Sequence, residues 1–208
     1  MAMKLYGILG SNNVRRAYAV ALHLKLDVEL IEVMPRSPEA QTPEFRRMSP
    51  AGRVPAFADG DYVTDESHAI MLYLAEQRPD TLWPATPRAR SQVMRWICWG
   101  QAHFREGWQP LQFERVIKPL LLKTPGDEAA VEAALPAFHR EAALLDRHLA
   151  GRQWLVDDTL SLADFSIGAA FSYAVPARLP LEPYANIRAW LARLDQLPAW
   201  QQTAPRPR

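Results

Sequence analysis

The most constraining feature of this chain is a proline-bearing hairpin that runs directly into a helix, over residues 53–77. An apolar run interrupted by Pro55 is followed by an Asp-Gly turn at 59–60, the strongest short-range signal for a β-hairpin. Proline cannot donate to a strand ladder, so we expect Pro55 where the strand ends. Asp65-Glu66-Ser67 then open a helix, whose exposed N–H groups form a site for an anion. The stretch therefore predicts an open peptide edge beside Pro55, followed by a carboxylate-sized site.

A strand, a helix and a second strand precede the hairpin. Residues 4–9 form a short extended run, and apolar residues then recur at helical spacing from Val14 to Leu22. A further extended run over 28–33 completes a βαβ unit. The prolines of the next segment leave room only for a short helix around Pro43–Met48. The resulting order, β-α-β-α-β-β-α, predicts a thioredoxin-like domain.

The composition changes after the hairpin helix, where three prolines fall between residues 79 and 87. We expect one domain over 1–78, a linker over 79–87 and an all-helical domain over 88–208. The predicted fold class is therefore α/β followed by all-α.

Four helices are indicated in the second domain. One begins near Arg88 and is expected to end near Gly107, where glycine weakens the helical pattern, and another covers about 109–122. A long helix should run from Asp127 to Gly151. Ser161 and Asp164 have the spacing of a capping box, which we assign to folding and not to chemistry. The tail from Ala204 to Arg208 is expected to be disordered.

Charge and cysteine usage exclude several classes of function. A net charge of +1 without a basic run argues against nucleic acid as a partner. The single cysteine, Cys98, rules out an internal disulfide framework and is expected to be a buried small apolar residue. No apolar run reaches the ~18 residues that span a membrane, and no signal peptide is visible. His103 could be a general acid or a histidine satisfied in the fold, and the other four histidines lack metal-ligand spacing. These features predict a cytoplasmic protein without a metal.

The motifs together resemble the glutathione transferase family, particularly its serine-type phi and theta classes. The resemblance rests on Lys4-Leu-Tyr-Gly7 with Ser11-Asn-Asn13 and Arg16, on Val54-Pro55 with Glu66-Ser67-x-Ala69-Ile70, and on Thr159-Leu-Ser-Leu-Ala-Asp-Phe165. It covers the whole chain in order and spacing. It implies a homodimeric enzyme that takes glutathione as co-substrate and adds the glutathione thiolate to a small, largely apolar electrophile.

The resemblance also implies a role for individual residues. Ser11 would donate its hydroxyl hydrogen bond to the glutathione sulfur. Val54 would pair its backbone N–H and C=O with the cysteinyl part, which requires Pro55 to be cis. Glu66 would accept from the γ-glutamyl ammonium group, and Ser67 would bind the γ-glutamyl carboxylate.

The residue that activates the thiol has alternatives. Ser11 follows the first strand and precedes a helix, where a positive field favours a thiolate, but it can also be a simple N-cap. Tyr6 is the rival within the family, although its position inside the strand favours packing of its ring. Asn12 or Asn13 could also donate to the sulfur.

The sequence departs from the phi pattern before Pro43. A basic His-Lys pair is expected there, and this chain has Ala40-Gln41. One anchor for the glycyl carboxylate is therefore weakened or moved, to Gln41 or Arg36. Arg53 stands where many members have Gln or Lys, and it can still reach a glutathione carboxylate.

The electrophile would lie against the helical domain, where aromatic residues cluster. The candidates for an apolar pocket are Trp99, His103, Phe104, Trp108 and Phe113. Aromatic residues at helical spacing can equally form the core.

Two other functions fit the same motifs. One is a glutathione-dependent disulfide reductase or peroxidase, and the other is a non-catalytic interaction module of the same fold. Ser11, Glu66 and Ser67 argue against the module.

Overall fold

A computed structural model describes residues 3–205, which divide into two compact units. The first unit runs to Ala85 and also includes the residues from Asp195 onward, and the second is Thr86–Leu194. The change from one unit to the other falls inside the predicted linker, at its C-terminal end. The expectation that 88–208 forms one domain differs from this division, because the last residues of the chain pack with the first unit.

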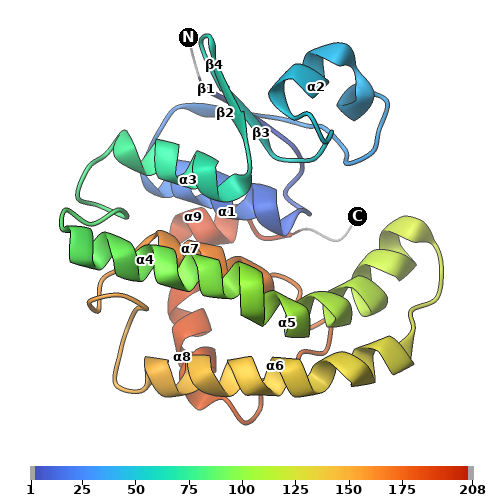
Figure 1. Cartoon of the computed structure of the whole chain (residues 1–208), viewed down its shortest axis with the longest axis vertical. Helices are drawn as coiled ribbons and strands as arrows, with labels where there is room; N and C mark the ends of the chain where they lie inside the picture. Colours follow the sequence, from blue (N-terminus) through green and yellow to red (C-terminus); the bar gives the residue numbers. More distant parts are fainter. Residues whose placement is uncertain (1–2, 206–208) are drawn as a thin grey trace. The chain divides into compact units, whose positions relative to one another are not determined.

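The first unit is built on a four-stranded mixed sheet with the order β2-β1-β3-β4 (Figure 1). β1 pairs in parallel with β2 and antiparallel with β3, which pairs antiparallel with β4. The strands are β1 Met3–Tyr6, β2 Val28–Ile31, β3 Ala56–Asp59 and β4 Tyr62–Asp65. The helices of this sheet are α1 Asn12–His23, α2 Pro43–Met48 and α3 Ser67–Glu76. This order confirms the predicted thioredoxin-like arrangement.

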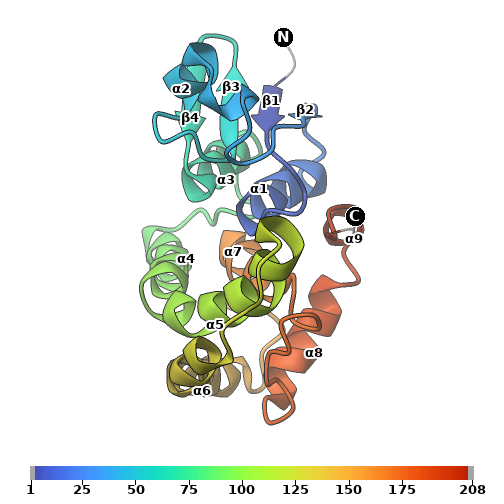
Figure 2. The same cartoon turned by 90° about the vertical axis from the view of Figure 1, so that its right-hand side faces the viewer.

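Helices α1 and α3 lie side by side on the sheet, whereas α2 lies apart from them against β3 and β4 (Figure 2). Leu5 of β1, Phe57 of β3 and Leu74 of α3 are fully buried between these layers. The inward-facing residues of the strands and the apolar face of α3 therefore pack into a single core. That core fixes where the N-terminal ends of α1 and α3 emerge.

The last helix of the chain, α9 Pro198–Gln202, packs on α1. Arg15 of α1 is only 5% exposed and donates from Nη2 to the Trp200 carbonyl at 3.2 Å. Its guanidinium carbon also lies 3.8 Å from the centre of the Trp200 ring, in a cation–π contact. These contacts explain why the C-terminal residues belong with the first unit. Of the tail predicted to be disordered, residues 206–208 lie outside the described part of the chain.

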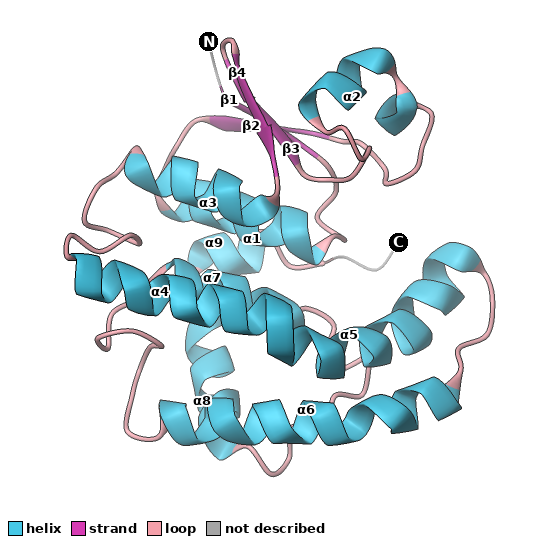
Figure 3. Cartoon of the chain, viewed as in Figure 1, coloured by secondary structure: helices cyan, strands magenta, loops and turns pink. Residues whose placement is uncertain are grey.

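In the second unit, residues 86–194, the regular structure is helical, and the strands of the described residues belong to the first unit (Figure 3). Its helices are α4 Pro87–Trp99, α5 Arg105–Gln112, α6 Glu128–Leu149, α7 Leu162–Gly168 and α8 Ala185–Leu194. π-helical segments join α4 to α5, over Gly100–Phe104, and extend α5 over Phe113–Leu122.

The predicted helix end near Gly107 is wrong, because the helical path continues through Gly107 within α5. A Cβ on Gly107 would lie 2.4 Å from the backbone nitrogen and Cα of Phe138 in α6. Glycine is present here because two helices approach closely, and not because a helix stops. The sequence pattern alone does not distinguish the two uses of glycine.

Cys98 is exposed, so the expectation of a buried cysteine is wrong. On α4 the buried side chains include Val93, Trp96, Ile97 and Trp99. At about 100° per residue, Cys98 points away from the middle of that buried face. The burial of a residue's sequence neighbours on a helix therefore does not predict its own burial, as Cys98 shows.

The predicted capping box at the start of α7 is confirmed. Asp164 is fully buried, and its Oδ2 accepts from the backbone N–H of Ser161 at 2.9 Å and from the Ser161 hydroxyl at 3.0 Å. Its Oδ1 accepts from the Leu155 N–H and from the Trp190 indole N–H, both at 3.0 Å. One carboxyl group thus joins α7, α8 and the loop before α7.

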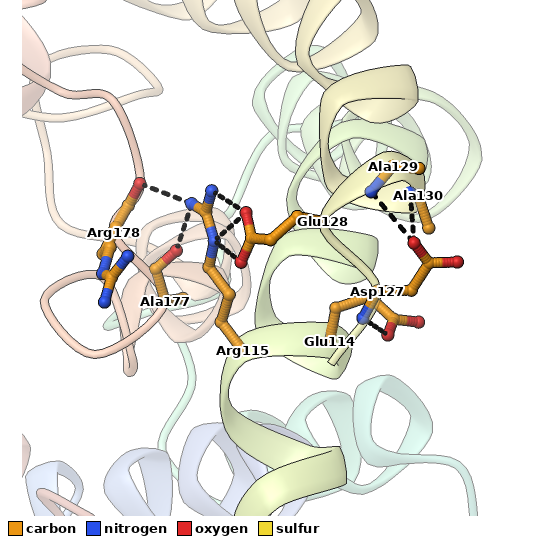
Figure 4. Close-up of polar contacts among 8 residues, drawn as sticks. All are labelled: Glu114, Arg115, Asp127, Glu128, Ala129, Ala130, Ala177 and Arg178. Atoms are coloured by element: carbon orange, nitrogen blue, oxygen red, sulfur yellow. Dashed lines mark hydrogen bonds and ion pairs between the residues drawn. The ribbon is translucent and has the colours of Figure 1, made fainter. Parts of the chain in front are cut away.

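A second polar network lies where the Phe113–Leu122 segment meets the start of α6 and the loop at Ala177 and Arg178 (Figure 4). Arg115 forms an ion pair with Glu128 of α6 at 2.7 Å and donates to the carbonyls of Ala177 and Arg178. Glu114 accepts from the Asp127 N–H at 2.8 Å. These contacts hold the turn between the Phe113–Leu122 segment and α6.

Within residues 3–205, none of the helices combines the length and the apolar character needed to cross a membrane.

Gly107→Ala should lower the stability of the protein although alanine favours a helix by about 1 kcal/mol. The added methyl group meets backbone atoms, which cannot move aside as a side chain can, so overpacking of about 1–3 kcal/mol should outweigh the gain. Thermal unfolding measures the result. Ala102→Gly, at an exposed position of the same helical run, is the control. It measures the stability difference between alanine and glycine in this helix without a change in packing. A raised melting temperature in Gly107→Ala would contradict the close approach to Phe138.

The pKa of Asp164 is raised to about 6, chiefly because complete burial disfavours the carboxylate. A raised folded-state pKa means that the folded protein binds the proton more tightly than the unfolded chain. The contribution of Asp164 to stability is therefore fully present below pH 3.8 and is lost as the pH rises through about 6. Asp164→Asn should lack this dependence. Denaturant unfolding of both proteins between pH 3.5 and 7 tests it, and parallel stability curves would refute it.

Candidate functional site

The first candidate group lies where β1 ends and α1 begins. Ser11 is the N-cap residue of α1, with φ −91° and ψ 123°, but its side chain makes no capping hydrogen bond. Its backbone N–H donates to the Ile8 carbonyl at 3.0 Å. The hydroxyl has no hydrogen-bond partner among residues 3–205. Ser11 therefore occupies the position of a cap without using its side chain as one, and it lies in the positive field of the helix.

The alternatives to Ser11 are placed differently. Tyr6 lies inside β1, and its ring makes an edge contact with Phe45 of α2 at 6.3 Å between centroids. Asn13 is exposed on the first turn of α1, and Asn12 is half-buried. Packing of the Tyr6 ring agrees with the expectation for a strand residue, and it favours Ser11 among the candidates.

The second group is the chain around Pro55, which enters β3. The Val54–Pro55 peptide bond is cis, as the resemblance required. Within residues 3–205, neither the N–H nor the C=O of Val54 has a hydrogen-bond partner. A Cβ on Gly7 would lie 3.2 Å from the Cβ of Val54 and 2.4 Å from Val14 of α1. Glycine at position 7 thus lets the open peptide edge approach the first turn of α1, which carries Ser11.

The third group is the start of α3. Glu66 is the N-cap residue, and its φ of 64° and ψ of 111° form a backbone conformation that residues other than glycine rarely adopt. Its side chain is exposed, and Ser67 beside it is 4% exposed. The Ser67 hydroxyl has no hydrogen-bond partner in the described part of the chain. Backbone strain of this kind persists only where the surroundings impose it, and it is concentrated at functional sites.

Ser49 braces the chain just before Glu66. Ser49 is fully buried and donates from its hydroxyl to Asp65 Oδ2 at 3.1 Å. The Ser49 hydroxyl oxygen also accepts a hydrogen bond from the Arg53 N–H at 3.2 Å. One hydroxyl therefore ties the residue before Glu66 to the residue before Val54, so the second and third groups are fixed to each other.

A buried arginine and a half-buried histidine are paired beside the third group. Arg16 of α1 is 2% exposed, and its Nη1 lies 2.7 Å from His68 Nε2. The pKa of His68 is lowered to about 3, first by burial and second by the positive charge of Arg16. His68 is therefore neutral at physiological pH and accepts the hydrogen bond from the guanidinium.

Arg46 of α2 was not among the predicted residues. It donates to the Gln41 Oε1 at 2.5 Å and to the Pro50 carbonyl at 2.6 Å. The side chains of Gln41 and Arg53 are exposed, as is Arg36. The guanidinium also lies so close to Gly52 that a Cβ there would be 2.9 Å from its Cζ. Gln41 is therefore held by Arg46.

The five aromatic candidates in the helical unit separate by burial. Phe104 is fully buried, and Trp99 and Trp108 are each 8% exposed. Trp99 stacks on Phe104 at 5.2 Å between centroids and donates its indole N–H to Glu141 at 2.8 Å. Only His103 and Phe113 are exposed. Trp99 and Phe104 thus contribute to the core of the second unit, which is the alternative that helical spacing left open.

Sequence reasoning missed Ser49, Asp65, Arg16, His68 and Arg46. Arginine and histidine are usually exposed, so nothing in the sequence marked Arg16 and His68 as a buried pair. Ser49 lies in a turn next to Pro50, where a serine is common. Its second role depends on Asp65, which is distant in sequence.

Together the three groups offer two helix N-termini, each with an unengaged serine hydroxyl, and an open peptide edge between them in sequence. Helix N-termini bind anions, and an open edge pairs with an extended peptide. The arrangement suits a short peptide that carries a carboxylate and an ionisable thiol.

Comparison with known proteins agrees with this chemistry. Residues 5–82 match the family model "Glutathione S-transferase, N-terminal domain", and residues 109–198 match "Glutathione S-transferase, C-terminal domain". Glutathione S-transferase 3 of Zea mays is 32% identical, with 97% of this chain and 92% of the relative covered. Glutathione S-transferase theta-1 of Mus musculus is 28% identical, with coverage of 94% and 83%.

Solved structures match over nearly the whole chain. A glutathione S-transferase I bound with lactoylglutathione has a TM-score of 0.90 at 28% identity, with 98% of this chain and 99% of that chain covered. Glutathione S-transferase I from maize, in complex with an atrazine glutathione conjugate, has a TM-score of 0.89 at 28% identity, with coverage of 98% and 97%.

Ser49→Ala should destabilise the first unit by about 1–3 kcal/mol, because it leaves the part-buried N–H of Arg53 and the carboxylate of Asp65 without their shared partner. Chemical denaturation measures the change. Ser91→Ala, at an exposed position of α4, is the control and should stay within about 0.5 kcal/mol of wild type. Equal unfolding midpoints for the two variants would mean that the brace contributes nothing.

Proposed function

This chain belongs to the glutathione S-transferase family, and we propose from that premise that Ser11, Val54, Glu66 and Ser67 hold glutathione and activate its sulfur. The enzyme is a transferase that joins the glutathione sulfur to an electrophile. The single observation that carries the assignment of residues is the unengaged Ser11 hydroxyl at the N-terminus of α1.

Ser11 stabilises the thiolate. A free thiol has a pKa near ~8.5, and a helix N-terminus with a hydrogen-bond donor lowers it. The Ser11 hydroxyl makes no internal bond, so it can donate to sulfur without first breaking one. Each unit by which the thiol pKa falls corresponds to ~1.4 kcal/mol of preference for the thiolate. The ionised sulfur then attacks the electrophile, and the leaving group departs with its electron pair.

Val54 holds the cysteinyl part of glutathione. Its N–H and C=O have no partner within residues 3–205, and Gly7 brings this edge toward the first turn of α1. An extended peptide that pairs with both groups places its central residue next to that turn. The central residue of glutathione is the cysteine, so pairing here directs its sulfur toward Ser11.

Glu66 and Ser67 hold the γ-glutamyl end. The exposed Glu66 carboxylate accepts from the ammonium group, and the Ser67 hydroxyl with the N-terminal amides of α3 binds the carboxylate. The left-handed backbone of Glu66 turns its side chain to solvent while its own carbonyl accepts from the Ile70 N–H at 3.1 Å.

For the glycyl carboxylate we propose the cluster of Gln41, Arg46 and Arg53. Arg46 is fixed by two hydrogen bonds, and Arg53 is exposed one residue before Val54. A held arginine and an exposed one replace the basic pair that the phi pattern has before Pro43. Arg36 is also exposed but makes no contact with this cluster in the described structure.

The nature of the electrophile, the homodimer and the cytoplasmic location stay predictions from the sequence. Of the aromatic candidates, His103 and Phe113 have exposed side chains that can reach a second substrate. The reductase or peroxidase alternative would use the same sulfur site, so it is distinguished by its second substrate.

Ser11→Ala should lower kcat/KM for conjugation of 1-chloro-2,4-dinitrobenzene by about 10²-fold, as expected for loss of one donor to a developing or stabilised anion. Ser11→Thr, which keeps a hydroxyl, should retain part of the activity, and Tyr6→Phe should resemble wild type. The wild-type protein and all variants should remain on immobilised glutathione.

Full activity in Ser11→Ala would assign the chemistry to Tyr6 or an asparagine. Failure of the wild type to bind glutathione would favour the interaction module. Turnover of hydroperoxides or disulfides without conjugation would favour the reductase or peroxidase.

A further inference from the structure

The bond between Arg16 and His68 is part-buried, and the proposed chemistry gives it no role. Arg16 Nη1 lies 2.7 Å from His68 Nε2, and Arg16 is 2% exposed. Arginine has no acceptor atom, so Nε2 must be the acceptor and the ring proton must lie on Nδ1. Because the pKa of His68 is lowered to about 3, this tautomer persists over the physiological range. A charge-assisted bond of this kind is among the stronger polar contacts in a protein.

The two residues belong to the two helices that begin at the site. Arg16 follows Ser11 by five residues on α1, and His68 follows Ser67 directly on α3. The bond therefore spans from the helix that carries the proposed sulfur ligand to the helix that carries the γ-glutamyl ligands. Apolar packing between α1 and α3 permits small sliding movements, whereas a hydrogen bond with one acceptor atom fixes a single relative position.

The bond also helps to keep the strained backbone of Glu66 in place, by holding the chain on one side of it. The Ser49–Asp65 bond holds the residue before Glu66, and the Arg16–His68 bond holds the second residue after it. A φ of 64° at a glutamate relaxes unless its neighbours are fixed. Two braces, one on each side, supply that fixation.

We propose that the Arg16–His68 hydrogen bond is a positioning element of the glutathione site, which holds Glu66 and Ser67 in the orientation that binds the γ-glutamyl end. The inference rests on the proposed function. Arg16 and His68 act through Glu66 and Ser67 and do not touch the substrate. Loss of the bond should therefore weaken glutathione binding and leave the conversion of bound glutathione almost unchanged.

The position of the acceptor atom provides a matched pair of variants. The amide oxygen of glutamine can take the place of His68 Nε2, whereas the shorter asparagine corresponds to Nδ1. His68→Asn should raise the glutathione dissociation constant and its KM about tenfold, in line with loss of a charge-assisted bond. His68→Gln should stay within about twofold of wild type, and kcat at saturating glutathione should change little in either variant. Calorimetric titration with glutathione and steady-state kinetics with 1-chloro-2,4-dinitrobenzene give these values.

Arg15→Met and Arg16→Met separate positioning from general loosening of α1. Both remove a buried guanidinium from the same helix, but Arg15 contacts Trp200 of α9, whereas Arg16 is bonded to His68 of α3. Both should lower the melting temperature, whereas only Arg16→Met should weaken glutathione binding. Amide hydrogen exchange without ligand should be faster at residues 66–70 in His68→Asn than in His68→Gln.

Equal glutathione affinity in His68→Asn and wild type would overturn this inference while leaving the proposed function intact. Equal weakening by Arg15→Met and Arg16→Met would also overturn it, because the loss would then follow from loosening of α1. Absence of glutathione binding by the wild type would overturn the proposed function and this inference with it.

Discussion

The arrangement of the first unit depends on two buried arginines next to each other on α1. A guanidinium removed from water is unfavourable unless its donors are satisfied, so each arginine determines what packs beside it. Arg15 is covered by the ring and carbonyl of Trp200, which brings α9 back to α1. Arg16 is matched by a neutral His68, which holds the start of α3. One helix thus carries the Ser11 site at its N-terminus and is fixed through both arginines.

The proposed glutathione site is organised before a ligand arrives. The Ser11 and Ser67 hydroxyls and the Val54 peptide groups are without partners in the described structure, while the residues behind them are bonded. Ser49 holds Asp65 and Arg53, and Glu66 lies strained between two bonded neighbours. Preorganised donors need little rearrangement when a charge develops on sulfur. The family's reaction asks little more of the protein, since the glutathione thiolate is itself the nucleophile.

The second unit shows a different use of the same residue types. Gly100 and Gly107 lie where a Cβ would come within 2.4 Å of Ile167 and of the Phe138 backbone, so small residues set the spacing of its helices. Trp99 and Phe104 stack in its core. Asp164, in a capping box, accepts four hydrogen bonds and connects α7 to α8. These residues stabilise the fold, and His103 and Phe113 are the exposed members of the proposed second-substrate pocket.

The sequence by itself determined the order of the strands and helices, the hairpin, the cis proline, the capping box and the membership of the family. The elements, the hairpin and the capping box depend on neighbours within a few residues, where turn chemistry and hydrophobic period act directly. The cis proline and the family followed from the resemblance of motifs along the whole chain. Only the tertiary structure decided that Gly107 marks close helix packing, that Cys98 is exposed, and that α9 returns to α1. The tertiary structure also decided that Arg16 is buried and paired with His68. The physical reason is that burial of a charged or small residue depends on partners distant in sequence, here 52 residues apart for Arg16 and His68 and 185 for Arg15 and Trp200.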